Sequence, residues 1–223
     1  EERKKLGKLI TPKVLEAVHY DYEHTIFSFI PNTAEVAFYG MMKGLEDHLN
    51  HLKTEHIKSF KGAIDDVELE RILSLRPRVE KLAIKDVKLR TFITNDSDRS
   101  NMVSHVYDVT YGQVASGVDT IVLIDDSIVR GTTLRQSIIA ILDRLLPKKI
   151  IIVSSAPPIC YPDCYGIDMS KMGDFVAFKA AIELTHARGN AALLDTVYRE
   201  CKEMEHLPSD KVHNAVKKIY EQF

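Results

Sequence analysis

Residues 121–133 read IVLIDDSIVRGTT, and this stretch decides the fold. Four apolar residues, Ile121 to Ile124, run directly into two acids, Asp125 and Asp126. A short loop with Gly131 follows, and apolar residues then recur at helical spacing. The stretch therefore predicts a buried strand, a tight loop and the start of a helix. In an open α/β sheet, the loop after the carboxyl end of a strand is where ligands bind.

The residue types in this loop indicate what it binds. Ser127, Thr132 and Thr133 offer hydroxyl groups, and the loop leads into a helix N-terminus with its backbone N–H groups. These are the donors that a phosphate group needs. Asp125 and Asp126 would repel a phosphate, but they suit sugar hydroxyls or Mg²⁺. Acids for a ribose beside donors for its phosphate predict a phosphoribosyl site.

The rest of the chain predicts an α/β architecture. The apolar run Lys149–Ser155 is a second strand, and strand, helix and strand in this order imply a right-handed crossover and a parallel sheet. We expect a further buried strand at Thr25–Ile30 and half-exposed strands within Val79–Ile93 and Val103–Tyr111. In the N-terminal half we expect a helix over 3–19 with a break at Pro12, and another from Ala34 to about Leu52. Further helices are expected from the loop to Leu146, over 174–188 or 190–205, and over 208–222.

Composition excludes several classes of protein. A hydrophobic content of 45% and a charged content of 28% are an ordinary balance for a soluble globular protein. The net charge of −2 gives no field that would attract nucleic acid or an anionic membrane. No stretch approaches the ~20 apolar residues of a membrane span. The three cysteines are an odd number without framework spacing, and no signal peptide is evident, so we expect a cytoplasmic protein.

The wording DDSIVRGTT resembles the signature of type I phosphoribosyltransferases, which bind phosphoribosyl pyrophosphate (PRPP). Together with SSAPPICYPDCYGIDMS at 154–170, it is similar to the C-terminal domain of the glutamine PRPP amidotransferase (amidophosphoribosyltransferase) family. Weaker matches follow the family's order: ERKKLGKL at 2–9, SFIPNTAEVA at 28–37 and RTFI at 90–93. The resemblance covers roughly residues 2–195.

The resemblance implies a fold and an organisation. The fold is α/β and type I phosphoribosyltransferase-like, with a mostly parallel twisted sheet flanked by helices and a small hood. Residues 1–223 would form a single domain, the C-terminal part of a longer parent. Residues 53–80 would be an insertion and residues 190–223 a helical C-terminal appendage. The N-terminal glutaminase domain of the parent would be a partner, and a homo-oligomer is also expected.

The resemblance also assigns site residues. The substrate-binding set is Asp125, Asp126, Ser127, Ile128, Val129, Arg130, Gly131, Thr132, Thr133 and Thr33. In this set the two acids hold the ribose hydroxyls, directly or through Mg²⁺ that accompanies PRPP, and Ser127 to Thr133 form the phosphate cradle. Arg130 is open to two interpretations, a ligand contact or a structural charge on the loop.

The parts of the family site that hold pyrophosphate depart from the family pattern. The family's first loop carries an acid and small hydroxyl residues after a proline, whereas this chain reads Pro31-Asn32-Thr33-Ala34. The family's mobile loop carries a Val-Arg-x-Lys-Leu pattern. Ser104 and Val106 stand at its two basic positions, so Arg99 and His105 are only weak catalytic candidates.

Cysteine spacing argues against the iron–sulfur cluster that some family members carry. Cys160, Cys164 and Cys201 contain no Cys-x-x-Cys pair, and three thiolates fall short of the usual four ligands. We therefore predict no cluster.

Three functions remain open. The first is an amidophosphoribosyltransferase, a glycosyltransferase of the pentosyl-transfer type acting in purine nucleotide synthesis. The second is a catalytically weak regulatory module that binds PRPP or a purine nucleoside monophosphate. The third is a structural domain with an empty site. The basic loop near residues 99–107 distinguishes them, because an enzyme needs its cations and a sensor does not.

Overall fold

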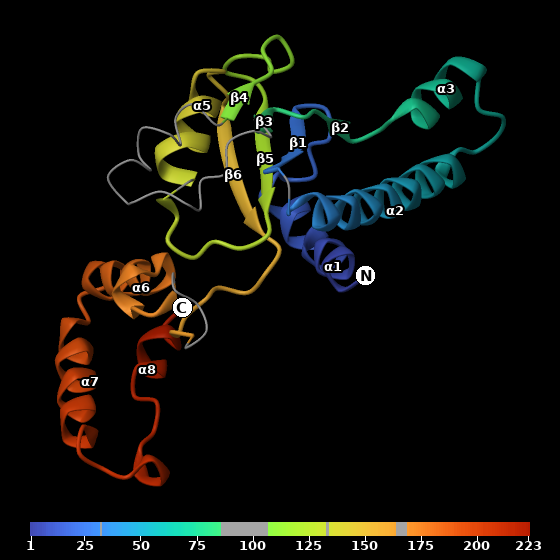
Figure 1. Cartoon of the computed structure of the whole chain (residues 1–223). Coiled ribbons are helices and arrows are strands. Elements are labelled where there is room, and N and C mark those ends of the chain that lie inside the picture. The colour runs from blue at the N-terminus through green and yellow to red at the C-terminus, as the bar shows by residue number, and fades with distance from the viewer. Residues whose placement is uncertain (32, 86–106, 133, 164–168) are drawn as a thin grey trace. The chain divides into compact units, whose positions relative to one another are not determined.

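The computed structural model describes residues 1–31, 33–85, 107–132, 134–163 and 169–223 (Figure 1). These residues form two compact units. The first contains Glu1–Ser127 and Thr132–Pro157, and the second contains Ile128–Gly131 and Pro158–Phe223. The chain therefore passes between the units three times. The expectation of a single domain over residues 1–223 with a small hood stays a prediction.

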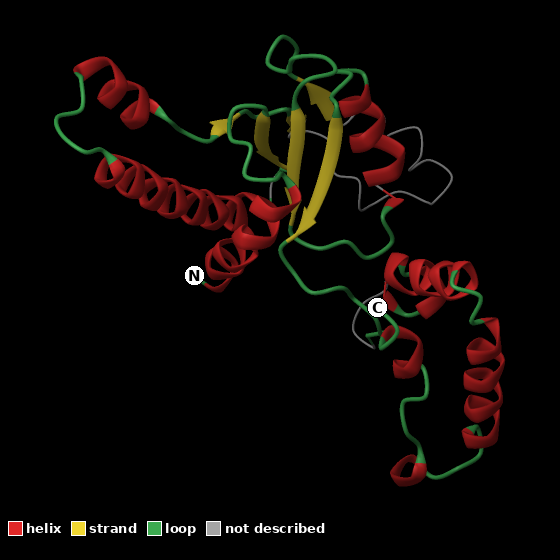
Figure 2. Cartoon of the chain, turned by 180° about the vertical axis from the view of Figure 1, so that it is seen from behind, coloured by secondary structure: helices red, strands yellow, loops and turns green. Residues whose placement is uncertain are grey.

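The first unit is built on a parallel sheet. Its strands are β1 (Thr25–Phe29), β2 (Arg78–Val79), β5 (Thr120–Asp125) and β6 (Lys149–Ser154), in the order β2-β1-β5-β6 (Figure 2). All three pairings are parallel. The predicted α/β class, the parallel sheet and the strand–helix–strand unit are confirmed.

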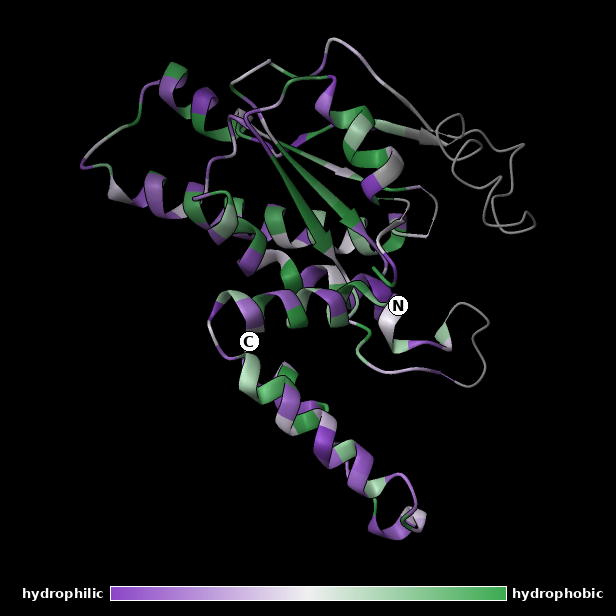
Figure 3. Ribbon diagram, turned by 90° about the vertical axis from the view of Figure 1, so that its left-hand side faces the viewer, coloured by the Kyte–Doolittle hydropathy of each residue, from purple (hydrophilic) through white to green (hydrophobic). Residues whose placement is uncertain are grey.

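The central strands are buried on both faces, which explains their continuous apolar sequences. Every residue of β1 is buried, and Ile121–Ile124 of β5 have no exposed surface. Phe27, Phe29 and their neighbours on β5 and β6 pack against α1 and α2, whereas α5 lies on the opposite face of the sheet (Figures 1 and 3). In Figure 3 the strands are the most hydrophobic part of this unit.

Helices α1 (Glu2–Ala17) and α2 (Glu35–Ser59) differ from the prediction at two points. The break expected at Pro12 is absent, since α1 continues through this residue. Packing along α2 outweighs the one backbone hydrogen bond that a proline removes. Helix α2 also continues past Leu52 to Ser59, because no glycine or proline interrupts the chain before Gly62.

Small residues bring α1 and α2 into backbone contact. A Cβ atom on Gly7 would overlap the carbonyl oxygen of Ala37, and one on Gly40 would overlap the carbonyl oxygen of Lys4. The hydroxyl of Thr11, which is buried, donates to the carbonyl of Gly7 at 3.2 Å or to that of Met41 at 3.3 Å. The two helices thus approach more closely than larger side chains would allow.

Replacing Gly40 with alanine should therefore destabilise the protein. Overpacking of this kind costs about 1–3 kcal/mol, and the higher helix propensity of alanine would offset only part of it. The measurement is urea unfolding followed by circular dichroism. Gly173→Ala is the matched control, because a Cβ there meets no atom within 4 Å. Equal effects of the two substitutions would contradict the close-approach argument.

Shorter elements complete the first unit. Helix α3 (Asp66–Ser74) is capped by Asp65, whose carboxylate accepts from the Glu68 N–H at 2.9 Å. Strands β3 (Ala83–Lys85) and β4 (Tyr107–Val109) form a separate antiparallel pair. After the signature loop come a π-helix, η1 (Leu134–Ile138), and α5 (Ile139–Asp143), so the helix predicted to reach Leu146 ends three residues earlier. Whether residues 53–80 are an insertion relative to the family stays a prediction.

The second unit is helical over most of its described residues. It contains η3 (Met172–Asp174), α6 (Val176–Ala187), α7 (Ala191–Met204), η4 (Ser209–Lys211) and α8 (Lys217–Tyr220). The sequence left two alternatives for one helix, 174–188 or 190–205, and the structure has a helix in each of these ranges. The helix predicted over 208–222 is instead two short turns, η4 and α8, separated by extended backbone at Val212. A small core of Ala181, Val197, Met204, Ala215 and Ile219 holds this unit together. Among the described helices of the chain, none combines the length and apolar character needed for a membrane span.

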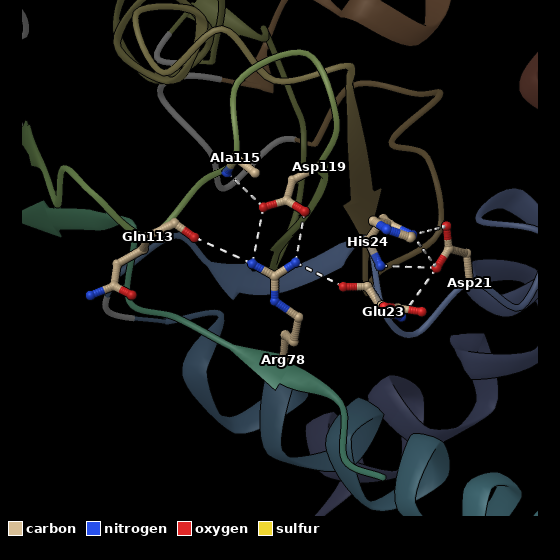
Figure 4. A network of polar contacts seen from close by, with 7 residues as sticks. All are labelled: Asp21, Glu23, His24, Arg78, Gln113, Ala115 and Asp119. Carbon is tan, nitrogen blue, oxygen red and sulfur yellow. Dashed lines mark hydrogen bonds and ion pairs between the residues drawn. The ribbon is translucent and has the colours of Figure 1, made fainter.

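An ion pair fixes the amino edge of the sheet (Figure 4). The Asp119 side chain is 1% exposed, and its two oxygens accept hydrogen bonds from Arg78 at 2.7 and 3.0 Å. The Ala115 N–H donates to the same carboxylate at 2.7 Å, and Arg78 also donates to the Glu23 carbonyl at 2.8 Å. Burial alone would raise the pKa of Asp119, but the hydrogen bonds from Arg78 and Ala115 lower it below the ordinary value.

Removing the cation of this pair should be costly. Arg78→Gln leaves a buried carboxylate without its charged partner. We expect the unfolding free energy at pH 7 to fall by roughly 2 kcal/mol. This is less than for a fully buried pair, because Arg78 is partly exposed. Because the pKa of Asp119 is lowered in the folded state, its carboxylate stabilises the fold at pH values above the unfolded-state pKa. The difference in unfolding free energy between the unsubstituted chain and the variant should therefore shrink as the pH falls below about 4. Urea unfolding at pH 7 and pH 3.5 measures it. Arg71→Gln, which breaks an exposed pair with Glu68, is the control and should have far less effect.

Candidate functional site

The acidic pair lies at the carboxyl edge of the sheet. Asp125 is the last residue of β5, opposite Ser154 of β6. The pairing continues beyond the strands, because the Ser155 N–H donates to the Asp125 carbonyl at 2.9 Å and the Ala156 N–H donates to the Asp126 carbonyl at 3.1 Å. The backbone of both acids is therefore held by β6 and the residues that follow it.

Local hydrogen bonds orient the two carboxylates. The Asp126 N–H donates to Oδ1 of Asp125 at 2.8 Å, and the Ser127 N–H donates to Oδ1 of Asp126 at 3.0 Å. Both acids are half-buried. Two adjacent carboxylates with fixed directions can accept hydrogen bonds from neighbouring sugar hydroxyls or coordinate a hard cation.

The electrostatics of the pair favour such a ligand. The pKa of Asp125 is raised to about 7, chiefly by burial. The hydrogen bond from the Asp126 N–H opposes this shift, and the neighbouring Asp126 side chain adds to it. The ionised form of Asp125 is thus disfavoured in the structure as it stands. Hydroxyl donors or a cation would relieve this cost, and carboxylate oxygens are the ligands that Mg²⁺ prefers.

The loop after the acids continues in the second unit. We call Ile128–Gly131, which the sequence predicts to bind phosphate, the phosphate loop. Gly131 has φ +70°, a left-handed conformation that favours glycine. The Val129 carbonyl accepts from the Val176 N–H at 2.8 Å, and the Arg130 guanidinium lies 3.7 Å from the Asp174 carboxylate. Both roles predicted for Arg130, a ligand contact or a structural charge on the loop, stay predictions.

The chain returns to the first unit at Thr132, which is exposed and begins the helical segment. The π-helix that follows is uncommon in proteins, and such segments occur often at functional sites. Thr133 lies outside the described residues.

The other predicted site residues are placed as follows. Thr33 is exposed after β1, at the same edge of the sheet as the acids, and its carbonyl accepts from Arg3 at 3.5 Å. Ala34 is fully buried at the start of α2. Arg99, His105, Ser104 and Val106 lie outside the described residues, so the prediction about the basic loop stays a prediction.

Sequence reasoning missed two serines at the same edge. The Ser155 hydroxyl donates to the Asp126 carbonyl at 3.3 Å, and the Ser154 hydroxyl donates to the Ala156 carbonyl at 2.9 Å. A signal for them was available, because two hydroxyl residues follow the apolar run of β6 just as two acids follow that of β5. Their carbonyl partners indicate that they shape the backbone around the acids.

Metal-binding options are few among the described residues, which contain no cluster of three or more histidine, cysteine or acidic side chains able to hold an ion. Asp125 and Asp126 alone would give a metal ion two side-chain ligands, so water or substrate oxygens would have to supply the rest. Cys160 and Cys201 are free thiols, and Cys164 lies outside the described residues. The prediction of no iron–sulfur cluster stays a prediction.

Asp125→Asn should stabilise the protein in a pH-dependent way. The pKa of the Asp125 carboxyl group is raised in the folded state. The unsubstituted protein therefore loses stability as the pH rises from the unfolded-state pKa near 4 towards 7. The amide keeps an acceptor for the Asp126 N–H but carries no charge. The melting temperature of the variant, relative to the unsubstituted chain, should therefore increase between pH 5 and pH 8. A difference that is constant or shrinks over this range would contradict the burial argument.

Comparison with known proteins finds partial similarity in sequence and in structure. No protein-family model matches the chain. The amidophosphoribosyltransferase of Pasteurella multocida is 47% identical over 58 residues, which are 26% of this chain and 11% of that protein. The amidophosphoribosyltransferase of Escherichia coli is 46% identical over 57 residues, again 26% of this chain and 11% of that protein. The matching stretch thus spans about a tenth of the length of these relatives.

A solved structure extends the similarity to the fold. The glutamine PRPP amidotransferase of Bacillus subtilis, complexed with ADP and GMP, superimposes with a TM-score of 0.51 at 24% sequence identity. The superposition covers 82% of this chain and 32% of that chain. The resemblance predicted from the signature stretch, and the fold class that it implied, are confirmed.

Proposed function

We propose that this chain, a relative of the amidophosphoribosyltransferases with their fold, is the phosphoribosyltransferase domain of such an enzyme. The reaction converts PRPP and glutamine-derived ammonia to 5-phosphoribosylamine and diphosphate, the first step of purine nucleotide synthesis. The observation that carries the proposal is the acidic pair at the carboxyl edge of β5, followed at once by a loop that turns through Gly131. This order supports the proposal, because the proposed ribose acceptors come directly before the proposed phosphate donors in the chain.

Each part of the substrate has a proposed partner. Asp125 and Asp126 accept hydrogen bonds from the ribose hydroxyls. Backbone N–H groups of the phosphate loop and the hydroxyls of Ser127, Thr132 and Thr133 bind the 5-phosphate. Mg²⁺, held by the two acids directly or through water, would neutralise part of the diphosphate charge.

The chemistry requires little covalent work from the protein. The nitrogen lone pair of ammonia forms a bond to the anomeric carbon, the carbon–oxygen bond to diphosphate breaks, and the extra proton on nitrogen passes to water. Positive charge develops on the ribose during this step. The protein therefore acts by orienting the ribose and by placing negative charge near it.

The proposal includes partners. In an enzyme of this type, a glutaminase domain N-terminal to this chain would supply the ammonia. The enzyme would act in the cytoplasm as a homo-oligomer. Its ligands would be PRPP and purine nucleoside monophosphates, which share the ribose 5-phosphate group. The structural relative from B. subtilis is complexed with ADP and GMP, which supports nucleotide binding by this fold.

A second candidate function is a regulatory module that binds PRPP or purine nucleotides with little turnover. The specific observation in its favour is Ala34, which is fully buried and supplies no hydroxyl where the family's first loop has hydroxyl residues. In the sequence, Ser104 and Val106 stand where the family has basic residues. Both departures affect the pyrophosphate half of the site and leave the ribose 5-phosphate half intact.

Calorimetric titration with ribose 5-phosphate and Mg²⁺ tests the shared part of both candidates. Asp126→Asn should weaken binding by about tenfold, since a hydrogen bond to a charged acceptor contributes about 1.5 kcal/mol. Thr132→Val should also weaken binding by removing a phosphate donor. Asp143→Asn, at an exposed position of α5, is the matched control and should bind as the unsubstituted chain does. Unchanged affinity in both site variants would remove the site assignment.

Release of diphosphate from PRPP with ammonia then separates the two candidates. Binding accompanied by release supports the enzyme. Binding of PRPP and GMP without release supports the regulatory module. No binding of any of these ligands would remove both.

A further inference from the structure

We propose that the segment Asp174–Val176, at the start of α6, positions the phosphate loop for its ligand, with Asp174 and Val176 as positioning residues. This inference rests on the proposed function. It concerns residues that the family resemblance did not assign to the site, and every contact that carries it lies within the second unit.

The central contact is a backbone hydrogen bond. The Val176 N–H donates to the Val129 carbonyl at 2.8 Å. Val176 is the first residue of α6, and the first N–H groups of a helix have no partner within it. A capping side chain usually accepts one of them, but Phe175 at the N-cap makes no such bond. The Val129 carbonyl supplies the acceptor instead, so the start of α6 and the phosphate loop stabilise each other.

Packing supports the same arrangement. Phe175 has no exposed surface and anchors the segment. The side chain of Val176 lies 3.6 Å from the position that a Cβ atom on Gly131 would occupy. A Cβ atom there would make only an ordinary van der Waals contact, so the side chain of Val176 lies beside the left-handed turn of the loop.

An ion pair adds direction. The Arg130 guanidinium lies 3.7 Å from the Asp174 carboxylate, and the two side chains are 30% and 45% exposed. A pair this exposed contributes little to folding stability. The pair can nevertheless keep the guanidinium of Arg130 in one orientation. This orientation affects the affinity for an anionic ligand more than it affects the stability of the fold.

These contacts have a consequence for affinity. A phosphate gains most from backbone N–H groups that already point in fixed directions, because ordering a loop on binding costs free energy. Loss of the Val129 acceptor bond should therefore lower affinity for a phosphate ligand more than it lowers stability.

Val176→Pro removes this hydrogen bond with little other change. Proline lacks the N–H but suits the first position of a helix, and the ψ of 132° at Phe175 is the conformation that a residue before proline adopts. Val176→Ala is the matched control, because it keeps the N–H and shortens the side chain. Calorimetry with ribose 5-phosphate and Mg²⁺ should show affinity about threefold to tenfold weaker for the proline variant. Affinity of Val176→Pro equal to that of Val176→Ala would overturn the role of this bond.

A double-mutant cycle tests the ion pair independently and does not depend on how well the proline variant folds. Asp174→Asn should weaken ribose 5-phosphate binding about twofold to threefold, and the effect should vanish in an Arg130→Gln background if Asp174 acts through Arg130. Asp174→Glu should restore most of the affinity. Asp195→Asn, an exposed aspartate on α7, is the control. An equal effect of Asp174→Asn in both backgrounds would overturn the positioning role.

The two proposals fail in different ways. If the unsubstituted chain binds ribose 5-phosphate, and Asp126→Asn weakens binding while the Val176 and Asp174 variants do not, only the positioning role is overturned. If the unsubstituted chain does not bind ribose 5-phosphate, both proposals are overturned.

Discussion

The position of β5 between β1 and β6 is the constraint on which the rest of the first unit depends. The strand is hydrogen-bonded on both sides and buried on both faces. Because side chains alternate along a strand, a slip of one residue would exchange its two faces and misplace every buried side chain. The same register sets Asp125 opposite Ser154 and brings the acidic pair to the edge of the sheet.

The two ends of β5 show how one residue type serves two purposes. Asp119, just before the strand, is buried but satisfied by Arg78 and a backbone N–H, and its pKa is lowered. Asp125, at the other end, is half-buried beside a second acid, and its pKa is raised. The amino edge is thus electrostatically relaxed, whereas the carboxyl edge retains unfavourable charge. Functional sites commonly show this pattern, because the missing compensation comes from the ligand.

The sequence predicted the features that depend on local pattern. The strand 121–124, the acids after it and the crossover to β6 follow from apolar runs and from the chain order of strand, helix and strand. Features that depend on distant residues were not predictable in this way. Arg78 and Asp119 are 41 positions apart, and nothing in the sequence around either one indicates the other. The continuity of α1 through Pro12 likewise depends on packing against α2, which a local rule for proline does not include.

The same distinction between local pattern and distant contacts applies to the candidate site. The signature stretch predicts the acidic pair and the turn at Gly131, because the residues that form them are consecutive in the sequence. The hydrogen bond from the Val176 N–H to the loop could not be predicted from the sequence. All residues except proline have a backbone N–H, so residue type does not indicate which one donates. Division of the signature loop between two units could not be read from the sequence either.

This division limits how the protein can be cut into pieces. Ile128–Gly131 packs with residues after Pro158, although the chain on either side of it belongs to the first unit. A single cut between Pro157 and Pro158 would leave these four residues on the N-terminal fragment, separated from the α6 helix that they cap. The N-terminal fragment would then hold all residues of the first unit, but the C-terminal fragment would lack four residues of the second. Recovery of the helical content of α6 on mixing the two fragments would be a direct physical readout of their reassembly.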